Sequence, residues 1–126
     1  MKVNWNERVS ARENAHRELP SLISSFYTKF HEELAKDQPP AKLHTLRLAT
    51  KKLRYTLELF RGCCGDEFEE ALEKLRNIQQ VLGDLNDCVA AWTLLSKKLP
   101  RGSERDRMKK YLDRRIKKLV KQLAAA

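Results

Sequence analysis

Apolar residues recur every three or four positions along almost the whole chain, and no stretch alternates in the manner of a half-buried strand. Leu22, Phe26, Phe30 and Leu34, for example, fall on one stripe, as the period of a helix requires. Helix-breaking residues interrupt the pattern at Pro20, Pro39, Pro40, Gly62, Gly65, Gly83, Pro100 and Gly102. The sequence therefore predicts an all-α protein.

The interruptions divide the chain into five predicted helices, over residues 4–36, 41–61, 67–82, 85–99 and 104–123. Pro20 should kink or split the first helix, and Gln38-Pro39-Pro40 should form the turn that starts the second. Gly83 should end the third. Because the intervening loops are short, we expect an up-down antiparallel bundle of four to five helices, forming a single domain over residues 1–126.

Several polar residues have more than one interpretation. Three pairs have the spacing of a capping box at predicted helix starts: Asp66 with Glu69, Asp84 with Asp87, and Ser103 with Asp106. Asp87 can instead orient a basic side chain on the facing helix. Gln79 interrupts the inner apolar stripe of the third helix, so its amide should hydrogen-bond to a neighbouring helix or loop.

The charge is strongly positive and unevenly placed. A formal net charge of +9 and a pI near 9.7 favour polyanionic partners such as nucleic acid, a phosphate polymer or anionic lipid. Residues 101–121 contain ten bases against three acids, a net of +7, and residues 42–61 contain six bases against one acid, a net of +5. The excess therefore lies in two of the predicted helices.

In the helix over residues 41–61, one side is apolar and the opposite side is basic. The basic side and its flanks comprise His44, Arg47, Lys51, Lys52, Arg54 and Tyr55. The row of His44, Arg47 and Lys51 has no acid of its own within the helix, and like charges at this spacing repel. The face is either solvated or a set of donors suited to a chain of phosphates.

The last predicted helix repeats this division. Its far side gathers basic residues, including Arg114, Lys117 and Lys118. This side is either a lysine-rich solvent face or a second wall of an anion-binding groove.

The three cysteines, Cys63, Cys64 and Cys88, form no disulfide framework, and no histidine lies at metal-ligand spacing from them. We expect reduced structural thiols, no metal site and no cofactor. His44 and Asp87 alone provide too few ligands for a metal.

Without a P-loop or an acidic cluster on the basic faces, the chain is predicted not to be an enzyme. No apolar run is long enough to span a membrane and no signal segment is visible, so we expect a cytoplasmic protein.

Two ordered motifs resemble the CHAD domain, the conserved histidine α-helical domain. They lie in "LHTLRLATKKLRYTLELF" and "LEKLRNIQQVLGDLNDCVAAW", within about residues 42–92. The first motif comprises His44, Arg47, Lys51, Lys52, Arg54 and Tyr55, and the second comprises Gln79, Leu82, Gly83, Asn86 and Asp87.

The resemblance implies an all-helical, non-catalytic domain that binds inorganic polyphosphate. The first motif would supply the contacts, with Arg76 and Lys74 as additions, while Gln79, Asn86 and Asp87 would fix the geometry behind them. Non-specific binding of nucleic acid is an alternative, as is a helical interaction module without an anionic ligand.

CHAD domains typically contain two such halves, each a helical bundle, whereas this chain contains one. Either a homodimer rebuilds the two-half arrangement, or a lone half binds more weakly or differently. We favour the homodimer, because Trp5, Leu22, Phe26 and Phe30 provide apolar surface for an interface.

Overall fold

Four α-helices and one short 3-10 helix make up the computed structural model, which describes residues 3–36 and 39–126. The elements are α1 (Ala11–Ala35), η1 (Pro40–Leu43), α2 (His44–Cys64), α3 (Glu69–Lys98) and α4 (Ser103–Ala124). The prediction of an all-α bundle is confirmed. Gln38 of the predicted turn lies outside the described residues.

Helix α1 begins at Ala11 rather than near residue 4, because a local cap fixes its start. The Ser10 side chain accepts a hydrogen bond from the Glu13 backbone N–H at 3.1 Å. The fully buried Asn14 side chain exchanges hydrogen bonds with the Asn6 backbone, at 2.7 and 2.9 Å. Pro20 does not split α1, which continues through it with the proline exposed.

Helix α3 is a single helix of 30 residues, so the prediction that Gly83 ends one helix and begins another is wrong. The apolar stripe continues across the glycine, from Ile78 and Leu82 to Leu85 and Cys88, and all four side chains are buried. A glycine inside a helix costs roughly 0.5–1 kcal/mol relative to alanine. Burial of the continuous stripe against α2 and α4 outweighs that cost.

The predicted capping boxes are also wrong. Neither α3 nor α4 has a side-chain hydrogen bond at its cap. Glu69 instead receives hydrogen bonds from Arg61, at 2.6 Å to each carboxylate oxygen. Asp84 and Asp87 lie in the interior of α3 and cap nothing.

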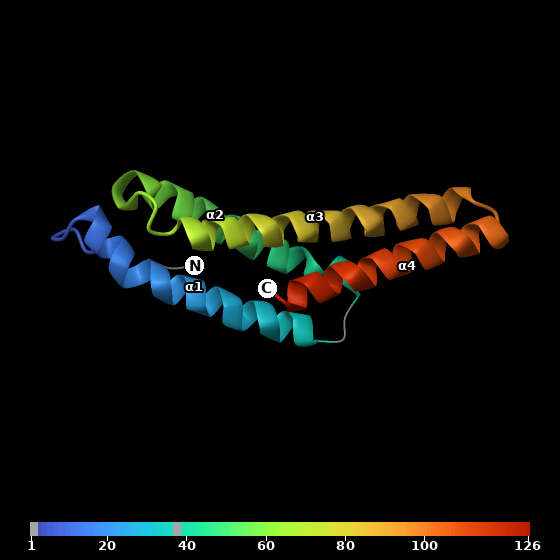
Figure 1. Cartoon of the computed structure of the whole chain (residues 1–126), viewed down its shortest axis with the longest axis horizontal. Coiled ribbons are helices and arrows are strands. Elements are labelled where there is room, and N and C mark those ends of the chain that lie inside the picture. Colours follow the sequence, from blue (N-terminus) through green and yellow to red (C-terminus); the bar gives the residue numbers. More distant parts are fainter. Residues whose placement is uncertain (1–2, 37–38) are drawn as a thin grey trace.

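The helices overlap along an elongated body (Figure 1). Helix α2 packs between α1 and α3, while α4 returns along α3 in the opposite direction. The far ends of α3 and α4 extend beyond α1 and α2 as a projecting hairpin. Helix α3 is therefore the shared element, in contact with both α2 and α4.

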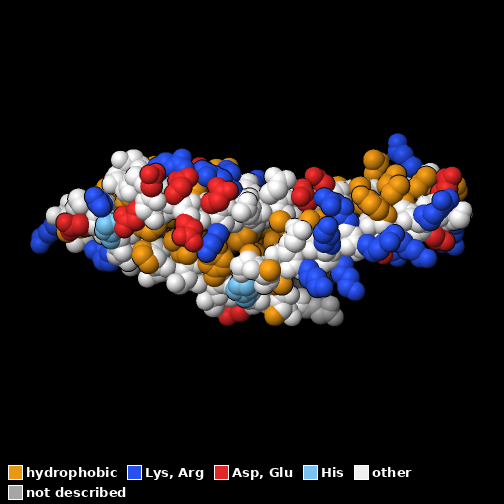
Figure 2. Space-filling view, in the orientation of Figure 1, with side chains coloured by type: hydrophobic (Ala, Val, Ile, Leu, Met, Phe, Trp, Pro, Cys, Tyr) orange, Lys and Arg blue, Asp and Glu red, His pale blue; other side chains and the backbone are white. Residues whose placement is uncertain are grey.

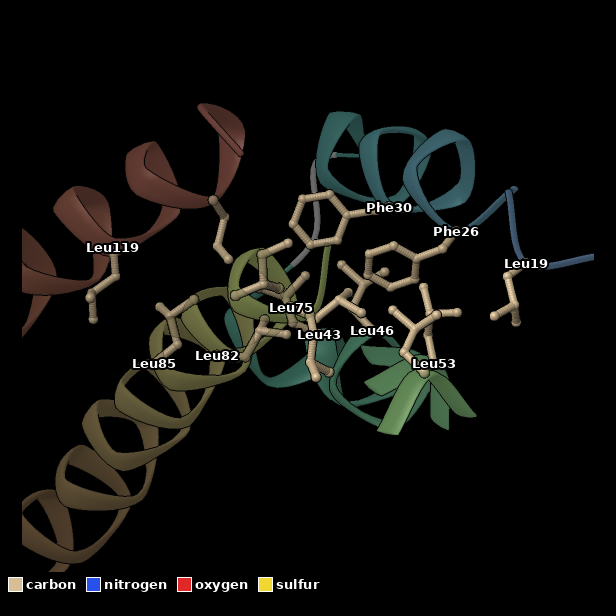
Figure 3. Close-up of a cluster of buried hydrophobic side chains, with 14 of the residues drawn as sticks. Leu19, Phe26, Phe30, Leu43, Leu46, Leu53, Leu75, Leu82, Leu85 and Leu119 are labelled. Carbon is tan, nitrogen blue, oxygen red and sulfur yellow. The ribbon is translucent and has the colours of Figure 1, made fainter. Parts of the chain in front are cut away.

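The core lies where the four helices overlap. Figure 3 shows Phe26 and Phe30 of α1 pointing towards Leu46 and Leu75. Phe26 is 7% exposed and Phe30 is fully buried, so both serve the core of one chain and are not available to a second copy. This contradicts the expectation that they provide interface surface. Trp5 remains 51% exposed, with its ring 6.1 Å from that of Phe60.

Two glycines should respond in opposite ways to substitution by alanine, because Gly83 lies inside α3 and Gly65 has a positive φ. Gly83→Ala should raise the free energy of unfolding by roughly 0.5–1 kcal/mol, since an added Cβ would meet nothing within 4 Å. Gly65→Ala should lower it by about 1–3 kcal/mol, because Gly65 has a φ of +58°. Urea unfolding measures both, and a destabilised Gly83→Ala variant would contradict a continuous α3.

Candidate anion-binding groove between α2 and α3

A polar groove of about 370 Å³ lies between α2 and α3. It is lined by Arg47, Arg54, Arg76, Gln79, Gln80, Gly83, Asp84 and Asp87. The apolar side of α2 fixes this arrangement: because Leu46, Leu53 and Leu57 are buried, the arginines that flank them lie along the border with α3. Five of the site residues predicted from the sequence therefore line one groove: Arg47, Arg54, Arg76, Gln79 and Asp87.

A second, smaller hollow adjoins the groove through Arg47, which lines both. His44 at the start of α2 and Asn86 of α3 line this hollow, and both residues are exposed. Its volume of about 20 Å³ holds no more than a water molecule. His44 and Asn86 thus mark one end of the row of polar side chains.

Two buried polar atoms in the groove have no hydrogen-bond partner, Arg54 Nε and Gln79 Oε1. The nearest acid to Arg54 Nε is Glu58, at 3.8 Å, and the Arg54 guanidinium lies 4.6 Å from the centroid of the Tyr55 ring. Most buried polar atoms in folded proteins have a partner, so these two atoms are unusual, and both belong to side chains that line the groove. Because a carboxamide presents an N–H₂ group after a half-turn about its terminal bond, Gln79 can also offer a donor here.

Acidic residues neutralise the bases at the other end of the groove. Arg76 lies 3.8 Å from Glu58, 3.4 Å from Glu69 and 3.6 Å from Glu73. The hydrogen bond from Arg61 lowers the pKa of Glu69, and Arg76 adds to this effect. The resulting stability is present at neutral pH and is lost as the pH falls through the lowered pKa.

Arg47 and Lys51 differ from Arg76, because no ion pair among the described residues involves either of them. Asp84 and Asp87 also line the groove, but Asp84 accepts a hydrogen bond from Gln80 at 3.1 Å. Arg47 is therefore a base without an ion pair within the described ranges, in a groove lined by three arginines and two aspartates.

The other predicted contacts lie outside the groove. Lys52 faces the opposite side of α2, where it lines a different hollow together with Lys29 of α1. Lys51 is half-buried, and Tyr55 is 54% exposed. Sequence reasoning missed Gln80, Gly83 and Asp84 as lining residues, because the predicted helix break at Gly83 concealed the single face that they share.

The basic residues of α4 are separate from this groove. Arg114, Lys117 and Lys118 are exposed, and none of them lines it. Figure 2 shows Lys and Arg side chains along the projecting hairpin, beside an apolar patch. The structure thus presents two basic surfaces rather than two walls of one groove.

The CHAD domain model matches residues 3–96 of the 126-residue chain. The chain belongs to the CHAD family. The match includes all of α2 and α3 as far as residue 96, with the full first motif, and it ends before α4. No curated protein and no solved structure matches the chain.

In this CHAD protein, none of the helices in the described ranges is both long and apolar enough to cross a membrane.

The ion pairs predict different contributions of Arg76 and Arg47 to stability. Arg76→Ala should lower the free energy of unfolding by about 0.5–1 kcal/mol, because it leaves Glu58, Glu69 and Glu73 without their shared cation. Arg47→Ala should stay within about 0.5 kcal/mol of the parent protein. Chemical unfolding at low and high salt tests this, and equal losses for the two variants would contradict it.

Proposed function

We propose that this protein binds inorganic polyphosphate along the groove between α2 and α3, without turning it over. The family is associated with polyphosphate binding. Arg47, Arg54 and Arg76 line the groove, and arginine suits phosphate because its planar guanidinium donates two parallel hydrogen bonds. His44 and Lys51 lie beside it and extend the row along α2.

The observation that supports the proposal most strongly is that an arginine without an ion pair and an arginine with an unsatisfied donor line the same groove. Arg47 has no acidic partner among the described residues, and in the same groove Arg54 Nε is buried without a hydrogen bond. A phosphate oxygen placed between them would accept from both side chains. Gln79, Asn86 and Asp87 of α3 would fix the geometry of the basic side chains from behind.

Binding without turnover fits the residues that line the groove. They include no serine or cysteine, and its two acids, Asp84 and Asp87, come from a single helix. A phosphoryl-transfer site needs metal ions or several donors fixed around one transferring phosphate. A row of donors along a helix instead distributes its contacts over a polymer.

The two-half arrangement of the family supports a homodimer as part of the proposal. Because Phe26 and Phe30 are buried in one chain, we place the contact on the projecting hairpin. Leu94, Met108 and Tyr111 of that hairpin are 56%, 36% and 57% exposed. Figure 2 shows apolar surface on the hairpin, beyond the ends of α1 and α2. A second copy of the hairpin would cover this surface with an identical one.

Long-chain polyphosphate should raise the melting temperature of the wild-type protein, and more so at low salt. Bound ligand at a hundredfold excess over Kd stabilises a protein by about 2.7 kcal/mol. Arg47→Ala/Lys51→Ala should lose most of the shift. The matched control is Lys29→Ala/Lys52→Ala, which removes the same charge from the hollow between α1 and α2 and should keep most of the shift.

The outcomes separate the alternatives. Equal losses in the two double variants would contradict a site in the groove and leave only general attraction to a basic protein. Displacement by an oligonucleotide at the same phosphate concentration would favour non-specific nucleic-acid binding. A wild-type protein that shows no shift would be a helical interaction module.

The exposed bases of α4 provide a further comparison. Arg114→Ala/Lys117→Ala/Lys118→Ala should reduce the shift less than the Arg47/Lys51 variant does, because these residues do not line the groove. Their effect should fall towards zero at high salt, as for fully solvated charges. A larger loss in the α4 variant would move the main binding surface to α4.

The dimer has its own test. Sedimentation equilibrium should show a dimer in the wild type and a monomer in Leu94→Glu/Tyr111→Glu. A monomeric wild type would contradict the homodimer while leaving the groove proposal standing.

A further inference from the structure

We infer that His16, Cys64 and Glu67 form a site for a zinc ion at the end of the protein opposite the projecting hairpin. One ligand atom from each residue lies within 4.8 Å of the other two. His16 comes from α1, Cys64 is the last residue of α2, and Glu67 lies in the turn before α3. Figure 1 shows that the first part of α1 and this turn lie at the same end of the molecule.

The spacing suits a metal. Zinc holds nitrogen, oxygen and sulfur ligands at about 2.0–2.3 Å, which places tetrahedral ligand atoms roughly 3.3–3.7 Å from one another. Small side-chain rotations would bring the three atoms to such distances. His16 Nε2 and Glu67 Oε2 are now in direct contact at 2.5 Å, so a zinc ion would have to replace this hydrogen bond and separate the two atoms by about 1 Å.

The chemistry of the set is also that of zinc. An imidazole, a thiolate and a carboxylate are all common zinc ligands, and a water molecule would complete the tetrahedron. Cys64 is 8% exposed, whereas the His16 and Glu67 side chains are each 40% exposed, so an ion can enter from solvent and reach the thiol. Binding would displace the thiol proton, as it does for coordinating cysteines in general.

The neighbouring thiol is the natural competitor for this role. Cys63 Sγ lies 3.5 Å from Cys64 Sγ, but it also lies 3.3 Å from the Phe60 carbonyl oxygen, to which it donates. It is not a member of the three-atom cluster. We therefore assign the three ligands without it.

The sequence prediction of no metal site rested on the absence of a histidine near the cysteines along the chain. His16 precedes Glu67 by 51 residues, and the packing of α1 against α2 brings them together. A bound ion would tie α1 to the turn between α2 and α3. It would add stability to the folded state, because the ligands are assembled only there.

The test is zinc titration of the full-length, reduced, metal-free protein in competition with a chromogenic chelator. The wild type should bind one ion per chain. Cys64→Ser and Glu67→Gln should each weaken binding at least tenfold. The matched controls are Cys88→Ser, another buried cysteine, and Glu70→Gln, an acid that is 87% exposed in its side chain, and both should bind as the wild type does.

Cobalt substitution identifies the thiolate. The Co²⁺-loaded wild type should show a thiolate-to-cobalt charge-transfer band in the near ultraviolet, and Cys64→Ser should lose it. Glu67→Gln changes an exposed side chain, so its result stands even if Cys64→Ser folds poorly. A wild type that binds no zinc, or a Glu67→Gln variant with unchanged affinity, would show that His16 and Glu67 form only a hydrogen bond.

Discussion

The unbroken course of α3 is the constraint on which the rest of the structure depends. Its first half packs against α2 and its buried stripe continues past Gly83, where α4 takes over as the main partner. A helix break at Gly83 would separate Arg76 and Gln79 from Asn86 and Asp87. Because α3 is continuous, these side chains lie in a line along one border of α2, and a polymer can follow them.

The arginines of the groove divide into two kinds. Arg76 is held by three glutamates and contributes to the fold, whereas Arg47 has no acidic partner among the described residues. Leaving a base uncompensated costs some stability through repulsion from its neighbours. If the proposed anionic ligand binds there, it relieves that cost, and stability and binding then depend on one another.

The helical class and the basic row of α2 could be predicted because both are periodic patterns within one element. The continuity of α3 could not be predicted, since Gly83 followed by Asp84 and then Asp87 has the local signature of one helix end and the next helix start. Only the packing of Leu82 and Leu85 against other helices overrides it. Lys52 was predicted to belong to the contact row, but it lines a hollow on the other side of α2, and the reason is related. Flanking positions on a helix point to different neighbours, and the position of α1 decides which. The proximity of His16 to Cys64 depends entirely on packing between helices.

The most direct test of polyphosphate binding in the groove is NMR of the arginine side-chain Nε–Hε groups during titration with tripolyphosphate. Arg54 Nε–H lacks a hydrogen-bond partner, so a phosphate that binds the Arg54 guanidinium and accepts from this group should shift its proton resonance downfield. Arg47 should shift with it, at the same ligand concentration. If the largest changes instead come from Arg107, Arg114 and Arg115 of α4, with Arg47 and Arg54 unmoved, the groove is not the binding site.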